Sequence, residues 1–150
     1  MAIKVPAIDM EFSKQFAEEA PLTVKYIRKN YQSTIDEASK EVGIDPNVVI
    51  AFMVIESGMM NGTGRVNPQA KSPVGALGLM QLMPPTAFDT IEKQAPVMSS
   101  KQITIVNKYL PGLVKPGGFT GFYKNYKPQL ESALFQGEFN IWLGTMQLAQ

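Results

Sequence analysis

A run of eight apolar residues, Val48–Ile55, constrains the fold of this chain more than any other feature. Asp45-Pro46 precedes the run, and an Asp N-cap followed by Pro at the first helical position is typical of a helix start. A buried β-strand is the competing interpretation, but the cap and the Ala51-Phe52-Met53 stretch favour a helix that ends between residues 57 and 60. Because this helix is apolar on nearly every side, we expect it in the core. The run is too short to span a bilayer.

Helical patterns cover most of the remaining chain. Apolar residues at spacings of three and four predict a helix over Thr23–Val42, and Gly43 follows where a helix end favours positive φ. A shorter helix is expected over Glu11–Ala20, ended by Pro21. Further helices are expected at 84–93, at 101–110 with Ser99 or Ser100 as the cap, at 128–135, and from 138 to the end. Residues 58–76 and 111–121 are Gly/Pro-containing loops, and no convincing pair of alternating strands occurs. The sequence therefore predicts a mainly α fold.

Two residue types are missing from the 150-residue chain, His and Cys. Their absence excludes Ser-His-Asp and Cys-His catalysis, His-ligated metals and zinc–thiolate sites. Carboxylates, Lys and Tyr remain for acid/base work. The net charge of +1 creates no strong field toward nucleic acid or a membrane surface, so neither is an expected partner.

Glu56 follows the apolar run directly, at the end of the predicted helix. Burial penalises its ionised form, and the helix macrodipole disfavours a negative charge there, so both effects raise its pKa. A carboxyl group that keeps its proton near neutral pH can protonate a glycosidic oxygen. The alternative is a glutamate that has reached the helix end and points into water.

Three segments together resemble the soluble lytic transglycosylase family. The family signature is Glu-Ser, then Asn-Pro-x-Ala-x-Ser, then Gly-Ala-x-Gly-Leu-Met-Gln-Leu-Met-Pro-x-Thr-Ala. Glu56-Ser57 matches the first part, and residues 67–87 match the rest almost position for position. Asn140-Ile141 with Gly144 is similar to the family's Asn-Ile-x-x-Gly helix.

The resemblance implies a lysozyme-like α-helical domain of the goose-type lysozyme kind. It implies cleavage of the β-1,4 bond between N-acetylmuramic acid and N-acetylglucosamine in peptidoglycan glycan strands, with Glu56 acting first as acid and then as base. The muramyl 6-hydroxyl attacks the anomeric carbon, which leaves a 1,6-anhydro product. This chemistry requires no metal and no other cofactor.

The same resemblance assigns substrate-binding residues, each with a structural alternative. They are Ser57 (or a helix-end cap), Gln81 (or a structural hydrogen bond), Met80 (or core packing), and Gly75 and Gly78 (or ordinary turn glycines). Asn140 is expected to hold a helix junction rather than to contact sugar.

The chain departs from the family pattern in three places. Extra residues occupy 59–66, and the stretch 88–139 is longer than the family needs. That stretch has its own aromatic residues, for which a satellite core is favoured over sugar stacking: Tyr109, Phe119, Phe122, Tyr123 and Tyr126. The family's next helix carries an Ala-Tyr-Asn-Ala-Gly motif, and the printed sequence reaches Gln150 without it. We therefore divide the chain into an N-terminal helical arm, 1–44, and a transglycosylase domain, 45–150, that lacks its C-terminal helices; either the sequence is a fragment or another chain supplies them.

Two other functions stay open. A muramidase on the same fold would use a second carboxylate to position water, and Asp89 and Glu92 are nearest to the motif. A non-catalytic structural module of a virion or secretion complex is the other. The N-terminal residues lack the apolar stretch of a signal peptide, and we expect a phage virion protein that opens the host wall locally, with a bacterial periplasmic enzyme as the alternative. Other virion or secretion-complex proteins are then expected partners.

Overall fold

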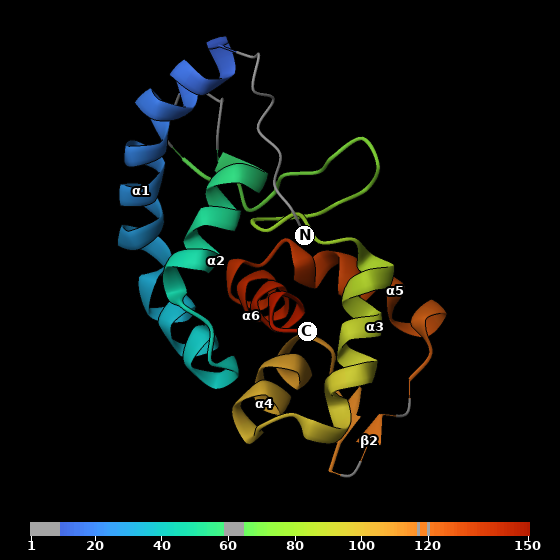
Figure 1. The fold of residues 1–150 in the computed structure, drawn as a ribbon. Coiled ribbons are helices and arrows are strands. Elements are labelled where there is room, and N and C mark those ends of the chain that lie inside the picture. Colours follow the sequence, from blue (N-terminus) through green and yellow to red (C-terminus); the bar gives the residue numbers. More distant parts are fainter. Residues whose placement is uncertain (1–9, 59–64, 117, 120) are drawn as a thin grey trace.

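A computed structural model describes residues 10–58, 65–116, 118–119 and 121–150, with side chains from residue 20 onward (Figure 1). The α-helices in these ranges are α1 (Met10–Val42), α2 (Pro46–Met53), α3 (Pro84–Gln94), α4 (Ser100–Tyr109), α5 (Tyr123–Leu134) and α6 (Gly137–Leu148). A π-helical turn, η1 (Val54–Gly58), extends α2, and a 3₁₀ turn, η2 (Ala95–Val97), follows α3. The prediction of a mainly α fold is confirmed.

Helix α6 lies in the middle of the molecule and holds the core together. Figure 1 shows it nearly end-on, with α1 and α2 on one side and α3, α4 and α5 around the other. Every residue from Phe139 to Met146 is buried. A helix that is apolar on nearly all sides is stable only when other elements surround it, which is the position of α6.

Helix α2 is less buried than its composition predicts. Val49, Ile50 and Met53 face the core, but Val48 is 39% exposed and Ala51 is also exposed. The expectation that this helix lies in the core is therefore met on one face only, because α1 and α6 pack against that face and leave Val48 and Ala51 exposed. The predicted start is confirmed, since the Asp45 side chain accepts a hydrogen bond from the Asn47 backbone N–H.

Two prolines that were expected to limit helices lie inside them instead. Helix α1 continues through Pro21, and α5 begins five residues before Pro128. An interior proline removes one backbone donor and costs about 3 kcal/mol relative to alanine. Packing on both sides offsets this cost, because Ala20 and Val24 flank Pro21 against the core, while Tyr126 and Leu130 do so around Pro128.

The second Gly/Pro loop contains a small hairpin that the sequence did not predict. Strands β1 (Val114–Lys115) and β2 (Gly118–Phe119) pair antiparallel, with Val114 opposite Phe119. Two-residue strands are too short to show an alternating pattern, which explains the error. The α4 prediction is confirmed, with Ser99 as N-cap in a capping box with Gln102.

Residues of the proposed N-terminal arm take part in the same core as the rest. Ile27 and Ile35 of α1 are fully buried and belong to one cluster with residues of α2, α3 and α6. The division after residue 44 stays a prediction. Most of the extra segment 59–66 lies outside the described residues; of its last two residues, Arg65 is exposed and Val66 is buried. Within the described ranges, no helix combines the length and the apolar character that crossing a bilayer requires.

Candidate active site

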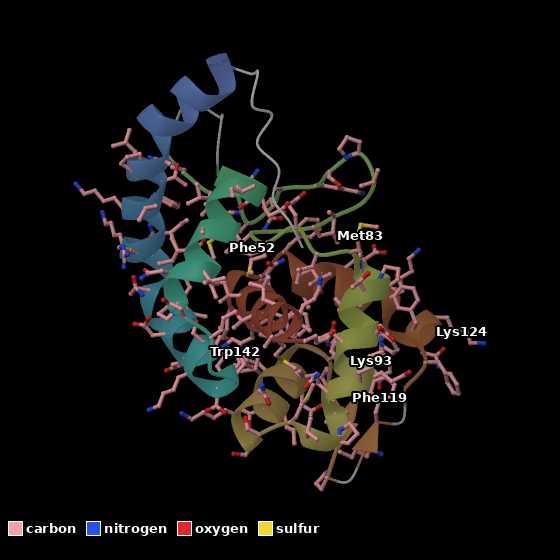
Figure 2. All side chains as sticks on the ribbon, in the orientation of Figure 1. Phe52, Met83, Lys93, Phe119, Lys124 and Trp142 are labelled. Carbon is pink, nitrogen blue, oxygen red and sulfur yellow. The ribbon has the colours of Figure 1, made fainter. Side chains whose placement is uncertain are left out.

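Glu56 lies in the π-helical turn η1 and borders a hollow of about 220 Å³. Four parts of the chain form this hollow: the end of α2 with η1, the loop before α3, the first turn of α3, and the end of α6. Its lining residues are Phe52, Glu56, Met80, Gln81, Leu82, Met83, Thr86, Gly144, Gln147 and Leu148. Figure 2 labels Phe52 on α2 and Met83 at the start of α3, with α6 below and between them in the view. We call this the Glu56 hollow.

The Glu56 carboxyl group is half-buried among mainly apolar neighbours. Burial raises its pKa above the ordinary value for glutamic acid. Among the described residues, no cation pairs with this carboxyl group and no donor hydrogen-bonds to it, so nothing offsets the cost of burying its charge. A carboxyl group that retains its proton to higher pH than usual is suited to act as a general acid.

This raised pKa leads to a prediction for stability against pH. The folded state binds the Glu56 proton more tightly than the unfolded state does, so its contribution to stability is complete below the unfolded pKa. That contribution is lost as the pH rises through the folded pKa. We expect the melting temperature of wild type, relative to that of Glu56→Gln, to fall across this window. Thermal melts of both proteins from acid to neutral pH measure the difference, and two curves that stay parallel would contradict the assignment.

The loop opposite Glu56 is a tight turn held by its own backbone. Leu77 and Leu82 exchange two backbone hydrogen bonds, of 2.9 and 3.0 Å. Gly78 and Gln81 inside this turn have φ of +79° and +52°, and the second value is unusual for a residue with a side chain. The Gln81 side chain stabilises the turn, since Nε2 donates to the carbonyl oxygens of Ala70 (3.1 Å) and Gly78 (2.9 Å).

Asn140 ties this turn to α6. Its side chain is fully buried, and Oδ1 accepts a hydrogen bond of 2.8 Å from the Met80 backbone N–H. Its Nδ2 donates to the carbonyl oxygens of Leu77 (2.9 Å) and Leu134 (2.8 Å). A Cβ atom on Gly78 would lie 2.2 Å from the Leu134 carbonyl oxygen, so only glycine fits there. The expectation that Asn140 holds a helix junction is confirmed.

The structure brings two of the five predicted binding residues to the Glu56 hollow, Met80 and Gln81. Ser57 does not line it; its hydroxyl donates to the Leu79 carbonyl oxygen at 2.6 Å and so ties η1 to the turn. Gly78, within the turn, faces the Leu134 carbonyl oxygen and the Asn140 side chain rather than the hollow. Gly75 has φ of +93° with nothing near its missing Cβ, as in an ordinary turn. Roles in substrate binding stay predictions for all five.

Seven residues of the hollow were not anticipated as site residues from the sequence, namely Phe52, Leu82, Met83, Thr86, Gly144, Gln147 and Leu148. For Gln147 a signal existed. Asn140, Gly144 and Gln147 are spaced by four and three residues, so they share one face of α6, and a Cβ on Gly144 would meet the Met80 side chain. The face that carries the Asn-Ile-x-x-Gly motif therefore continues to Gln147.

The acidic residues nearest to the motif lie elsewhere. Asp89 pairs with Lys93 at 2.8 Å on the surface of α3, and both Asp89 and Glu92 line a different hollow beside the exposed Phe122. Glu56 is the one carboxylate among the described residues that line its hollow. Within the described ranges, no three acidic residues gather closely enough to hold a metal ion.

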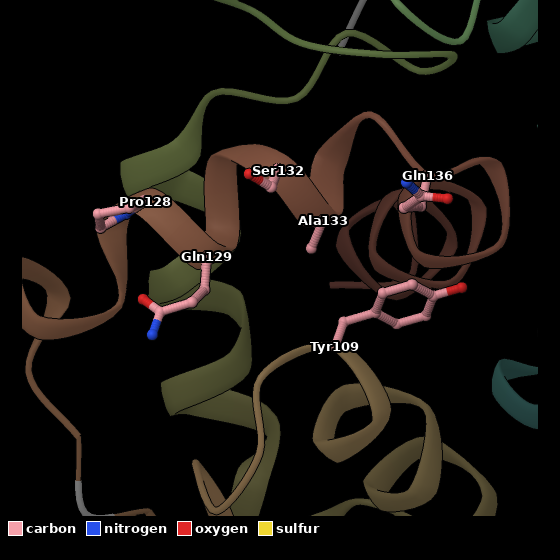
Figure 3. A pocket seen from close by; sticks show the side chains of 6 residues that line it. All are labelled: Tyr109, Pro128, Gln129, Ser132, Ala133 and Gln136. Carbon is pink, nitrogen blue, oxygen red and sulfur yellow. The ribbon is translucent and has the colours of Figure 1, made fainter.

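The aromatic residues of 88–139 mostly pack against the main core, so the separate satellite core that was expected is not seen. Phe88 contacts Phe119 and Tyr123, with ring centres 5.2 and 5.5 Å apart, whereas Phe122 is 68% exposed and does not follow the expectation. Tyr109 lines a larger hollow of about 430 Å³ with Gln129 and Gln136, shown in Figure 3. No tyrosine is among the described residues that line the Glu56 hollow.

Comparison with known proteins gives one family match. The model of the transglycosylase SLT domain matches residues 33–110, just over half of the chain. The matched range contains Glu56-Ser57 and the whole turn around Gly78, and it begins inside α1. No solved structure matches the chain.

Proposed function

The chain belongs to the transglycosylase SLT family, which acts on peptidoglycan, and we propose that it cleaves the β-1,4 bond between N-acetylmuramic acid and N-acetylglucosamine without using water. The observation that carries this proposal is the half-buried Glu56 carboxyl group with its raised pKa, set in a hollow beside Met80 and Gln81. A single carboxylic acid is sufficient for this reaction.

The proposed reaction has two proton transfers, both at Glu56. First the protonated carboxyl group donates its proton to the glycosidic oxygen as the bond from that oxygen to the anomeric carbon breaks. The resulting carboxylate then takes the proton of the muramyl 6-hydroxyl while that oxygen bonds to the anomeric carbon. Glu56 returns to its protonated state, and the product is a 1,6-anhydromuramyl end. The substrate's own acetamido group can stabilise the positive charge between the two steps.

A hydrolase on the same fold is the second candidate, and it makes a different product. An inverting or retaining glycosidase places a second carboxylate within about 5–10 Å of the acid. Asp89 and Glu92 line a separate hollow, which disfavours this role for them. We expect mass spectrometry of digested peptidoglycan to show anhydromuramyl products, each lighter by one water than a hydrolysis product. Products that all carry reducing ends would establish a muramidase instead.

We further propose that the activity serves local opening of the bacterial wall by a phage virion, with a periplasmic or secretion-system enzyme as the alternative. The extra residues at 59–66 and the length of the stretch 88–139 support a specialised setting. Antibodies against the chain should detect it in purified virions of a phage that encodes it. Detection only in the periplasm of an uninfected bacterium would favour the alternative.

A further inference from the structure

The Glu56 hollow has few polar side chains available to bind a sugar. They belong to Glu56, Gln81, Thr86 and Gln147. The Gln81 amide nitrogen is already committed, because it donates to two carbonyl oxygens of its own loop. Gln147 is different, because its side chain makes no hydrogen bond to any described residue.

The side-chain oxygen of Gln147 is an anomaly among the polar atoms of the residues that line the Glu56 hollow. Oε1 is shut off from solvent and has no hydrogen-bond partner among the described residues. Buried polar atoms in folded proteins are nearly always paired, and an unpaired acceptor lowers stability. An unpaired acceptor at the edge of a candidate active site requires an explanation. One explanation is that a bound ligand supplies the missing hydrogen-bond donor.

The backbone that carries Gln147 is held by the contacts of α6, and its long side chain has several rotamers. Gln147 is in the last turn of α6, on the face where Asn140 binds the Met80 turn and Gly144 packs against Met80. Three side-chain torsions separate the carboxamide from this backbone. A change of rotamer can therefore turn Oε1 toward the hollow without moving the helix.

We propose that Gln147 is a substrate-positioning residue, whose carboxamide oxygen accepts a hydrogen bond from the glycan strand next to Glu56. The donor is an N–H or O–H group of a sugar, either the acetamido N–H or a ring hydroxyl. The inference rests on the proposed peptidoglycan cleavage. In this proposal Gln147 positions the sugar, and Glu56 carries out both proton transfers.

The test uses Gln147→Met, which keeps the length and helix preference of the side chain but removes its hydrogen-bonding groups. We expect KM for soluble peptidoglycan fragments to rise about three- to tenfold, which is the usual effect of one lost hydrogen bond, with a smaller change in kcat. The melting temperature should stay equal or rise, because an unpaired buried acceptor has been removed. Gln129→Met, on the exposed surface of α5, is the matched control and should change neither KM nor kcat.

Binding of short N-acetylglucosamine oligomers, and of analogues in which an acetate ester replaces each acetamido group, identifies the donor. The ester keeps the shape of the acetyl group but has no N–H. If the acetamido N–H is the donor, this replacement weakens binding to wild type more than binding to Gln147→Met. If a hydroxyl is the donor, the replacement changes binding to both proteins equally, while the variant binds both oligomers more weakly than wild type.

Two results would overturn the assignment of Gln147. One is an unchanged KM in Gln147→Met together with unchanged binding of both oligomers. The other is a lowered melting temperature with unchanged KM, which would show a purely structural role. Wild type that releases no fragments from peptidoglycan would instead refute the proposed function, and this inference with it.

Discussion

The Glu56→Gln variant is expected to lose peptidoglycan cleavage by about a hundred- to ten-thousand-fold, the usual contribution of general acid/base catalysis. The amide has nearly the same volume as the carboxyl group but has no proton to give to the leaving oxygen. The fold should be retained, because no described residue depends on the Glu56 carboxylate for a hydrogen bond or an ion pair. Clearance of purified cell walls, measured beside a thermal melt, separates lost catalysis from lost structure.

Glu92→Gln is the matched control for this experiment. Glu92 is exposed on α3 and lines a different hollow, so the same change there should leave activity unchanged. A Glu56→Gln protein that clears walls at nearly the wild-type rate would remove Glu56 from the mechanism. If activity is lost in Glu92→Gln and kept in Glu56→Gln, the active site lies on the surface of α3 and not in the Glu56 hollow.

The Asn140→Ala variant is expected to lose about 3–5 kcal/mol of the free energy of unfolding. Three buried backbone groups lose their partner at once, and each unsatisfied group costs about 1–3 kcal/mol. Small domains have only about 5–15 kcal/mol in total, so the drop in melting temperature should be large. Activity per folded molecule should fall too, because the Met80-Gln81 turn is no longer held against α6.

Asn107 offers a matched comparison away from the Glu56 hollow. Its side chain bridges the backbone of Val114 through two hydrogen bonds of 2.7 and 3.1 Å, and it is only partly buried. Asn107→Ala should therefore be destabilised less than Asn140→Ala, with normal activity per folded molecule. Chemical denaturation of both variants gives the comparison, and equal losses of stability would contradict the role assigned to Asn140.

Local signals in the sequence predicted most of the helices correctly. The Asp45-Pro46 cap, the Ser99 cap and the glycine after Val42 each mark a helix end in the structure. Two of the errors, both at prolines, came from non-local packing. Pro21 and Pro128 looked like helix limits, but α1 and α5 continue through them, and residues beside each proline pack against the core.

The candidate site was predictable where one segment carries it and unpredictable where several segments meet. Glu56 and the turn at 77–82 are recognisable from local sequence. The π geometry of η1 leaves no sequence pattern, and Phe52, Met83 and Gln147 join the hollow only because three helices converge there. Helical periodicity could have placed Gln147 on the face of Asn140, but not in contact with the surroundings of Glu56.

The hydrogen bonds from the buried Asn140 to the 77–82 turn also determine how early the Glu56 hollow can form during synthesis of the chain. The bond between Asn140 and Met80 joins residues 60 positions apart, and three other residues of the Glu56 hollow lie still later in the chain. A ribosome adds about 5–20 residues per second, so the turn emerges roughly 3–12 s before Asn140 does. Throughout that interval the nascent chain contains Glu56 but not the residues of α6 that complete the Glu56 hollow. The proposed activity therefore requires α6 to have been synthesised and to have docked, even if the earlier helices have already formed.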